Sequence, residues 1–130
     1  MPDESMPNIY LLNSCPFCLK LRIFLSEAGL ADRFNFVTFE QGNDTHREVR
    51  ARLEAAGHRP SFPAVEFSSG EFTTGTDDII ARIAGDAGVE PTTMPLLKYY
   101  SEGVFTAYLQ TYSELRELKD AQASQLVKER

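Results

Sequence analysis

The stretch Asn13-Ser14-Cys15-Pro16-Phe17-Cys18-Leu19-Lys20 decides the fold, and it holds both cysteines of the 130-residue chain. A short apolar run at residues 9–12 precedes it, and a helical pattern of apolar residues continues from it to Ala28. Cys15 is therefore expected between a strand and the first turn of a helix, where unsatisfied N–H groups and the helix dipole favour a thiolate. Pro16 suits the first helical position, because its missing N–H is not needed there. This pattern indicates a redox pair, with Cys15 as the exposed thiolate and Cys18 as the partner that can form a disulfide with it.

The two cysteines taken alone leave other interpretations open. Cysteines separated by two residues also occur in structural disulfides, as half of a zinc site, and as packed core side chains. A disulfide in the cytosol is more often transient and catalytic than structural. His46 and His58 lie far along the chain without ligand spacing, so we expect both to be surface histidines and predict no metal site.

Composition favours one soluble globular domain, with 42% hydrophobic and 25% charged residues. The net charge of −6 argues against a nucleic-acid partner, because neutralising phosphates needs a basic face. The first eight residues include Asp3 and Glu4 and no apolar stretch, so we expect no signal peptide. No apolar run approaches the roughly 20 residues of a membrane span. We therefore expect a cytoplasmic protein with no nucleic-acid and no membrane partner.

The first half of the chain alternates strand and helix signals. Residues 8–13 form a short, almost continuously apolar strand, and residues 16–28 form a helix that ends at Gly29. Residues 34–39 alternate with period two, which predicts a second strand. A strand, a helix and a strand in this order imply a right-handed crossover and parallel pairing.

The next segment predicts a thin helical cover, a hairpin and a third helix. The helix is expected at residues 46–56, with Asp44 or Thr45 as its cap and few large apolar side chains. Residues 64–67 and 71–74 flank a turn, which predicts a β-hairpin. A third helix is expected at residues 79–84, after Thr76-Asp77-Asp78, with Thr76 as its N-cap.

We expect five parts along the chain: a flexible tail at 1–7, a domain at 8–85, a linker at 86–95, a long helix at 96–118, and a polar tail at 119–130. A helix over residues 96–118 would be roughly 35 Å long, longer than a small domain is wide. It has two interpretations, a helix packed on its own sheet or a contact that gives a homodimer through the C-terminal helix.

Three stretches of the chain together resemble glutaredoxins. They are Cys15-Pro16-Phe17-Cys18, Ser61-Phe62-Pro63 and Gly75-Thr76-Asp77-Asp78. Glutaredoxins have Thr-Val-Pro with a cis proline at the second and Gly-Cys/Thr-Asp-Asp at the third, and the likeness covers residues 8–85. It implies an α/β, thioredoxin-like fold: a four-stranded mixed sheet (βαβ-α-ββ-α) flanked by helices, with the long C-terminal helix as an addition. Residues 62–66, Phe-Pro-Ala-Val-Glu, are also similar to the N-terminal domain of glutathione S-transferases.

The resemblance implies a glutathione-dependent thiol–disulfide oxidoreductase. Cys15 and Cys18 would be catalytic, with glutathione as co-substrate and no cofactor bound permanently. The partners would be glutathione and glutathionylated or disulfide-containing proteins. The residues that the resemblance assigns to glutathione binding are Phe17, Phe62, Pro63, Thr76 and Asp77.

Each of these glutathione contacts has a physical basis. A cis bond before Pro63 would turn the backbone of Phe62 outward, so that it can pair with an extended peptide beside Cys15. The N-terminus of the third helix offers the N–H groups of Thr76 and Asp77 to a carboxylate. The side chain of Asp77 can take the ammonium of a γ-glutamyl group. Without the other motifs, the same residues would be only a helix cap.

One departure weakens the electropositive setting of Cys15. Glutaredoxins usually have a lysine three residues before the first cysteine, and Leu12 occupies that place here. An arginine at 47, 50, 52 or 59 could substitute, and we expect Cys15 to be less acidic than in a typical glutaredoxin. The alternative function is a glutathione-binding or redox-sensing module with little turnover, related to the N-terminal domain of glutathione S-transferases. Carriage of an iron–sulfur cluster is a further alternative, which Pro16 disfavours because it stiffens the loop.

Overall fold

The computed structural model describes the backbone of residues 5–128 and the side chains of residues 5–125. The chain divides into two compact units, Met1–Leu97 and Lys98–Arg130, and each is described by itself. The predicted tail at residues 1–7 falls largely outside the described residues, as do the last two residues of the predicted polar tail. The predicted domain boundaries stay a prediction.

The first unit contains a four-stranded mixed sheet. Its elements are β1 (Asn8–Leu12), α1 (Pro16–Glu27), β2 (Asn35–Phe39), α2 (Asp44–Ala55), β3 (Ala64–Ser68), β4 (Glu71–Thr74) and α3 (Thr76–Ala87). The strand order is β2-β1-β3-β4, with β1 parallel to β2 and antiparallel to β3, and with β3 antiparallel to β4. The predicted thioredoxin-like fold is confirmed.

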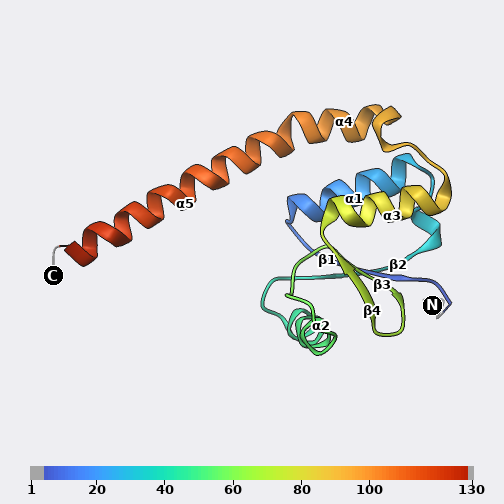
Figure 1. Ribbon diagram of the computed structural model, residues 1–130, viewed down its shortest axis with the longest axis horizontal. Coiled ribbons are helices and arrows are strands. Elements are labelled where there is room, and N and C mark those ends of the chain that lie inside the picture. Colours follow the sequence, from blue (N-terminus) through green and yellow to red (C-terminus); the bar gives the residue numbers. More distant parts are fainter. Residues whose placement is uncertain (1–4, 129–130) are drawn as a thin grey trace. The chain divides into compact units, whose positions relative to one another are not determined.

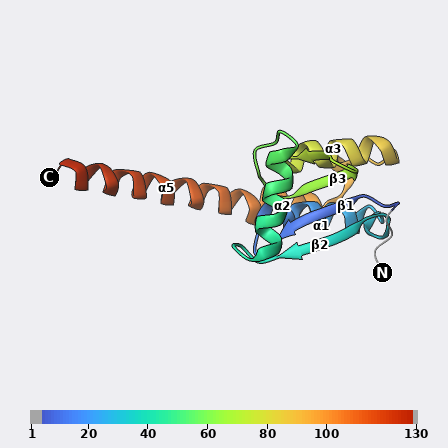
Figure 2. The ribbon, with the colours of Figure 1, turned by 90° about the horizontal axis from the view of Figure 1, so that it is seen from below.

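Helices cover both faces of the sheet. α1 and α3 lie on one face, and α2 lies on the other (Figures 1 and 2). Successive residues of a strand point to opposite faces. Ile9 of β1 therefore packs with the core under α1 and α3, whereas Tyr10 packs with the core under α2. The fully buried Phe24 anchors the first core, and the fully buried Leu53 anchors the second.

The helix caps differ in detail from the predicted ones. Asn43, rather than Asp44 or Thr45, caps α2, because its side-chain oxygen accepts the N–H of His46 at 2.9 Å. Thr76 is the first residue of α3 instead of its N-cap, and Gly75 takes the cap position with φ +90°. Only glycine adopts this φ without strain, so the chain turns at Gly75 and Thr76 becomes buried.

The end of the chain differs from the single helix predicted at residues 96–118. Two helices are present, α4 (Pro95–Glu102) and α5 (Val104–Lys128), and Gly103 separates them. A Cβ at Gly103 would lie 3.0 Å from the carbonyl oxygen of Tyr99, so the backbone approaches closely where the helix is interrupted. Residues 119–128, predicted as a polar tail, continue α5, because alanine, glutamine and lysine are good helix formers even without an apolar face.

Little of the predicted linker at residues 86–95 is irregular. α3 extends to Ala87, and a 3₁₀ turn spans Pro91–Thr93. The carboxylate of Glu27 accepts the N–H groups of Leu96 and Leu97 at 2.9 Å each, and so caps the start of α4. None of the helices in the described part of the chain is both long enough and apolar enough to cross a bilayer.

Candidate functional site

Cys15 is the N-cap of α1, in the position that the sequence predicts. Its sulfur accepts the N–H of Cys18 at 3.3 Å, and Pro16 is the first helical residue. The same sulfur lies 3.9 Å from the carbonyl oxygen of Phe62, to which the thiol can donate. Cys15 is partly exposed, Cys18 is only 3% exposed, and neither is in a disulfide. The two cysteines therefore differ in access, and a reactant in solution can reach only the first.

Hydrogen bonding separates the pKa values of the two thiols. The Cys18 thiol, followed by the backbone N–H groups of Cys18 and Phe17, lowers the pKa of Cys15 from 9.0 to about 6, although burial opposes the shift. The same hydrogen bond, together with burial and the negative charge of Cys15, raises the pKa of Cys18. With a pKa of about 6, Cys15 is about nine-tenths thiolate at pH 7.

The acidity of Cys15 arises from hydrogen bonds and not from a nearby cation. Leu12 stands where a lysine was expected, and it packs against the apolar core. Two of the arginines considered as substitutes are held elsewhere. Arg47 bonds to Asp44 and to the carbonyl oxygen of Gly42, and Arg52 bonds to the strand residues described below.

The loop before β3 brings its backbone to Cys15. The peptide bond between Phe62 and Pro63 is cis, as the sequence predicts, and Pro63 is fully buried. The ring of Phe62 packs edge-on against Phe39 at 5.1 Å and against His46 at 5.5 Å between ring centroids. These contacts hold the ring of Phe62 against the α2 side of the sheet, while its carbonyl oxygen faces the sulfur of Cys15.

The N-terminus of α3 completes the arrangement. The hydroxyl of Thr76 donates to the carbonyl oxygen of Phe17 at 3.5 Å, which links α3 to the first turn of α1. Asp77 is exposed over 86% of its side chain and pairs with the ammonium of Lys20 at 3.0 Å. The fold therefore brings the seven predicted site residues to three adjoining places: the start of α1, the cis-proline loop and the start of α3.

Lys20 is the residue at this site that sequence reasoning missed. It lies two residues after Cys18, and its side chain is only 16% exposed. Its partner Asp77 is 57 residues away in the chain, so only the packing of α1 beside α3 brings the two together. The signal in the sequence was a lysine in the second turn of α1, the helix that begins at the two cysteines.

His46 corrects the expectation of a surface histidine. It is 6% exposed, stacks on Phe39 with ring centroids 5.6 Å apart, and accepts the N–H of Gly42 at its Nδ1 at 2.7 Å. Burial, followed by the charges of Arg50 and Arg47, lowers the pKa of His46, so the ring is neutral near pH 7. It lies on the same helical face as Val49, which is why it faces the sheet. His58 is half-buried.

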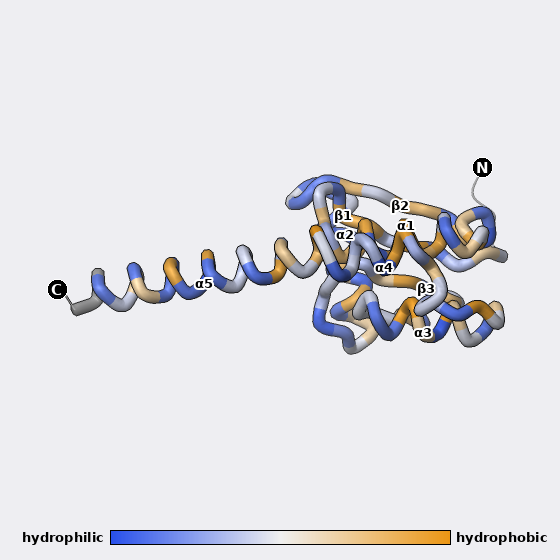
Figure 3. The backbone as a smooth tube through the Cα atoms, turned by 90° about the horizontal axis from the view of Figure 1, so that it is seen from above, coloured by the Kyte–Doolittle hydropathy of each residue, from blue (hydrophilic) through white to orange (hydrophobic). Residues whose placement is uncertain are grey.

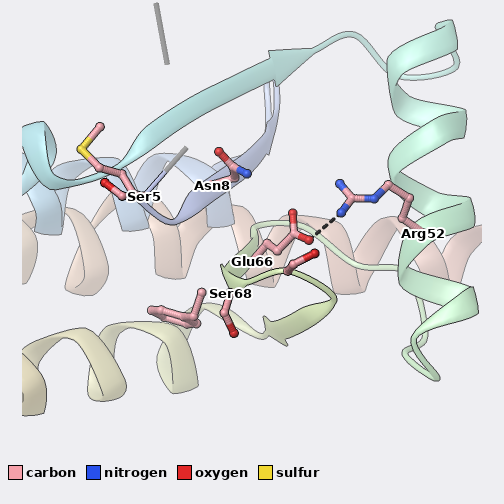
Figure 4. A pocket seen from close by; sticks show the side chains of 8 residues that line it. Ser5, Asn8, Arg52, Glu66 and Ser68 are labelled. Atoms are coloured by element: carbon pink, nitrogen blue, oxygen red, sulfur yellow. Dashed lines mark hydrogen bonds and ion pairs between the residues drawn. The ribbon is translucent and has the colours of Figure 1, made fainter. Parts of the chain in front are cut away.

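A second polar cluster lies on the α2 side of the sheet, away from the predicted site residues. Glu66, 5% exposed, accepts hydrogen bonds from the hydroxyl of Tyr10, the guanidinium of Arg52 and the N–H of Gly70. Figure 4 shows the contact between Glu66 and Arg52. Burial alone would raise the pKa of Glu66, but these hydrogen bonds together lower it. A concavity of about 420 Å³ adjoins the cluster. Because its polar groups satisfy one another, we assign the cluster to stability. Within the described residues, no group of three or more metal-ligating side chains comes together.

Comparison with known proteins gives the family. The sequence model of the family "Glutathione S-transferase, N-terminal domain" matches residues 14–85, more than half of the chain. The chain belongs to this family. No curated protein matches it.

Two solved structures are similar to the chain. Oxidized glutaredoxin 2 from Chlamydomonas reinhardtii is 30% identical over 70% of this chain and 77% of that one, with a TM-score of 0.45. Glutathione transferase Omega 2C from Trametes versicolor is 14% identical over 62% of this chain, with a TM-score of 0.49. The match covers 37% of that transferase, so the chain spans just over a third of its length. By its family and its fold, the chain is a thioredoxin-fold member of a glutathione-associated family and carries a closely spaced pair of cysteines.

Proposed function

We propose that the protein is a glutathione-dependent thiol–disulfide oxidoreductase that reduces glutathione mixed disulfides through Cys15. The observation that carries this proposal is the asymmetry of the two thiols. Cys15 is partly exposed and has a pKa of about 6, whereas Cys18 is buried and has a raised pKa. A thiolate at neutral pH in a position that solvent reaches is the nucleophile that thiol–disulfide exchange requires.

The reaction proceeds in two exchanges. The Cys15 thiolate attacks the glutathione sulfur of a mixed disulfide, forms a disulfide between Cys15 and glutathione, and releases the other thiol, which takes a proton from water. A second glutathione, as its thiolate, then attacks the glutathione sulfur on Cys15. Oxidised glutathione leaves, and the Cys15 thiolate is regenerated. The net result is that one glutathione from solution reduces the mixed disulfide, and its sulfur joins the glutathionyl sulfur from the substrate in oxidised glutathione.

The backbone of Phe62 and the start of α3 would hold glutathione. An extended peptide beside Cys15 can pair with the N–H and C=O of Phe62, since this backbone faces the sulfur. The first N–H groups of α3, those of Thr76 and Asp77, suit the carboxylate of the γ-glutamyl group. Its ammonium would replace Lys20 as the partner of Asp77. Lys20, once displaced from Asp77, would remain near enough to serve as a counter-charge for the γ-glutamyl carboxylate.

Cys18 gives the enzyme a second route, the reduction of protein disulfides. In this route the Cys18 thiolate attacks the mixed disulfide between Cys15 and a substrate protein, and the substrate leaves as a thiol. In the free enzyme, the hydrogen bond to Cys15, burial and the negative charge of Cys15 raise the pKa of Cys18. Formation of the mixed disulfide removes the charge on Cys15, but Cys18 stays buried, so its thiolate is still disfavoured. This burial supports the one-cysteine route with small glutathione disulfides.

Two serine variants test the mechanism with glutathione as the only reductant. We expect Cys15→Ser to abolish reduction of a glutathione mixed disulfide. Cys18→Ser should retain substantial activity, because it keeps the nucleophile and a small polar side chain beside it. Far-ultraviolet circular dichroism of both variants checks that they fold. Activity in a folded Cys15→Ser protein would show that another group is the nucleophile.

Membership of the transferase N-terminal domain family supports a second candidate, a glutathione-binding or redox-sensing module with little turnover. Calorimetric titration with glutathione separates the two candidates. Tight binding of glutathione to the Cys15→Ser variant, with negligible mixed-disulfide reduction by the unmodified protein, would favour the module. Rapid turnover that depends on Cys15 would favour the enzyme.

A further inference from the structure

α5 exposes an apolar stripe along its N-terminal half. After Val104, five apolar side chains of this helix are between 38% and 68% exposed: Tyr108, Leu109, Tyr112, Leu115 and Leu118. Hydrophobic positions recur along α5 between polar ones (Figure 3). A solvated helix gains nothing from such a stripe, and helices of this kind obtain most of their stability from burying one apolar face.

The centre of the stripe has the spacing of a coiled-coil seam. We call the residues Tyr108, Tyr112, Leu115 and Lys119 the seam, because their steps alternate between four and three residues, as the apolar positions of a heptad repeat do. Phe105 lies one step earlier, but it is buried and packs on Tyr100 with ring centroids 5.5 Å apart. Tyr108 is therefore the first exposed position of the seam. Tyr108 and Tyr112 stack on one another at 6.0 Å and present a continuous aromatic surface.

We propose that α5 pairs in antiparallel orientation with α5 of a second copy of this chain, Tyr112 lying against the partner's Leu115 and Tyr108 against the partner's Lys119. The alternating steps divide the seam into two kinds of position, Tyr108 with Leu115 and Tyr112 with Lys119. In an antiparallel pair, each kind lies against the other kind on the partner helix. This register therefore brings all four seam residues of each helix into contact.

The charge of Lys119 favours the antiparallel orientation, and the low net charge of α5 favours a second copy of the chain as its partner. Lys119 is the one charged residue of the seam, and a parallel pair would place it beside the partner's Lys119. In the antiparallel register its stem and ammonium lie on the ring of the partner's Tyr108, an arrangement that a cation–π contact stabilises. The described part of α5 carries three acidic and two basic side chains, so its net charge is near zero although the chain carries −6. Self-repulsion of the acidic protein is thus weakest along this helix.

The expected interface is small. From the exposed fractions of the five side chains, each helix would bury on the order of 500 Å², against about 800 Å² per partner in a standard interface. A total near 1,000 Å² falls at the lower end of specific interfaces, so the dimer should depend on concentration.

Sedimentation equilibrium of the full chain under reducing conditions tests the pairing. We expect a monomer–dimer equilibrium with a dissociation constant in the micromolar range, and a monomer persisting at about 200 µM would overturn the proposal. Tyr112→Glu should raise the dissociation constant at least about tenfold. Gln110→Glu, which adds the same charge on the opposite face, should change it by less than about twofold. Leu115→Gln gives a second seam variant that keeps high helix propensity, in case Tyr112→Glu lowers the helix content.

A cysteine at Gln122 tests the orientation in a Cys15→Ser, Cys18→Ser background. In the antiparallel register, Gln122 lies opposite the partner's Phe105, roughly 25 Å along the helix from the partner's Gln122. We therefore expect no disulfide-linked dimer on mild oxidation of Gln122→Cys. A parallel pair would bring the two introduced cysteines together and link them. Efficient linking would overturn the antiparallel arrangement, and equal effects of Tyr112→Glu and Gln110→Glu would overturn the seam.

Discussion

Replacing Cys18 with alanine isolates the interaction that makes Cys15 acidic. The Cys18 thiol is the largest cause of the lowered pKa of Cys15, ahead of the backbone N–H groups of Cys18 and Phe17. Cys18→Ala removes that thiol and leaves the backbone in place. Since the N–H of residue 18 still lies 3.3 Å from the Cys15 sulfur, part of the shift should survive.

The size of the effect follows from the hydrogen bonds that remain. We expect the pKa of Cys15 to rise by about 1–2 units in Cys18→Ala, because one of the donors that stabilise its thiolate is lost. From a starting pKa of about 6, the thiolate fraction at pH 7 falls from about nine-tenths to between about a half and a tenth. Cys18→Ser should show a smaller rise, since a hydroxyl can still donate to the thiolate.

The pH dependence of alkylation by iodoacetamide measures this pKa directly. The rate follows the thiolate population, so its midpoint gives the pKa of Cys15, and Cys15→Ser provides the background. We expect a midpoint near 6 for the unmodified protein. If Cys18→Ala titrates at the same pH as the unmodified protein, the side chain of Cys18 is not the cause of the acidity. The helix dipole and backbone N–H groups would then account for all of it.

Two further substitutions test other parts of the molecule. Lys20→Ala removes the cation that would serve as counter-charge for the γ-glutamyl carboxylate of glutathione. We expect the KM for glutathione to rise about three- to tenfold with kcat nearly unchanged, because only binding is affected. An unchanged KM, or failure of Lys20→Arg to restore it, would remove Lys20 from the site. Arg52→Ala leaves the buried Glu66 without its guanidinium, so we expect urea denaturation to show a loss of about 1–3 kcal/mol in the free energy of unfolding, a range that allows for the partial exposure of Arg52. The exposed neighbour Arg50→Ala is the matched control and should change this free energy by less than about 0.5 kcal/mol, so equal losses in both variants would refute a special role for the pair.

Local signals in the sequence predicted the fold and the position of the reactive cysteine. The apolar strand, the Cys-Pro pair and the helical spacing that follows act over a few residues, and each favours the same strand-to-helix junction. The predicted end of the last helix was wrong, because its apolar pattern and its helix propensity point to different residues. The last helix was expected to end at residue 118 because its apolar pattern fades there, but helix propensity alone carries α5 on to Lys128.

Local signals could not predict the contacts that His46 and Lys20 make near the site. His46 was expected at the surface because it lies far along the chain from the cysteines without ligand spacing, yet its position on α2 packs it against Phe39. Lys20 and Asp77 are separated by 57 residues, and their pairing depends on the side-by-side packing of α1 and α3.

The N-cap position of Cys15 follows from neighbours within one helical turn, so the local pattern of the chain was enough to identify it as the candidate nucleophile. Its acidity and its surroundings depend on the packed fold. The pKa of Cys15 depends on a buried Cys18, and its sulfur faces the backbone carbonyl of Phe62, 47 residues away in the chain. Burial and long-range hydrogen bonds arise only when the sheet and its helices are packed, and they set both the acidity of the thiol and the shape of its site.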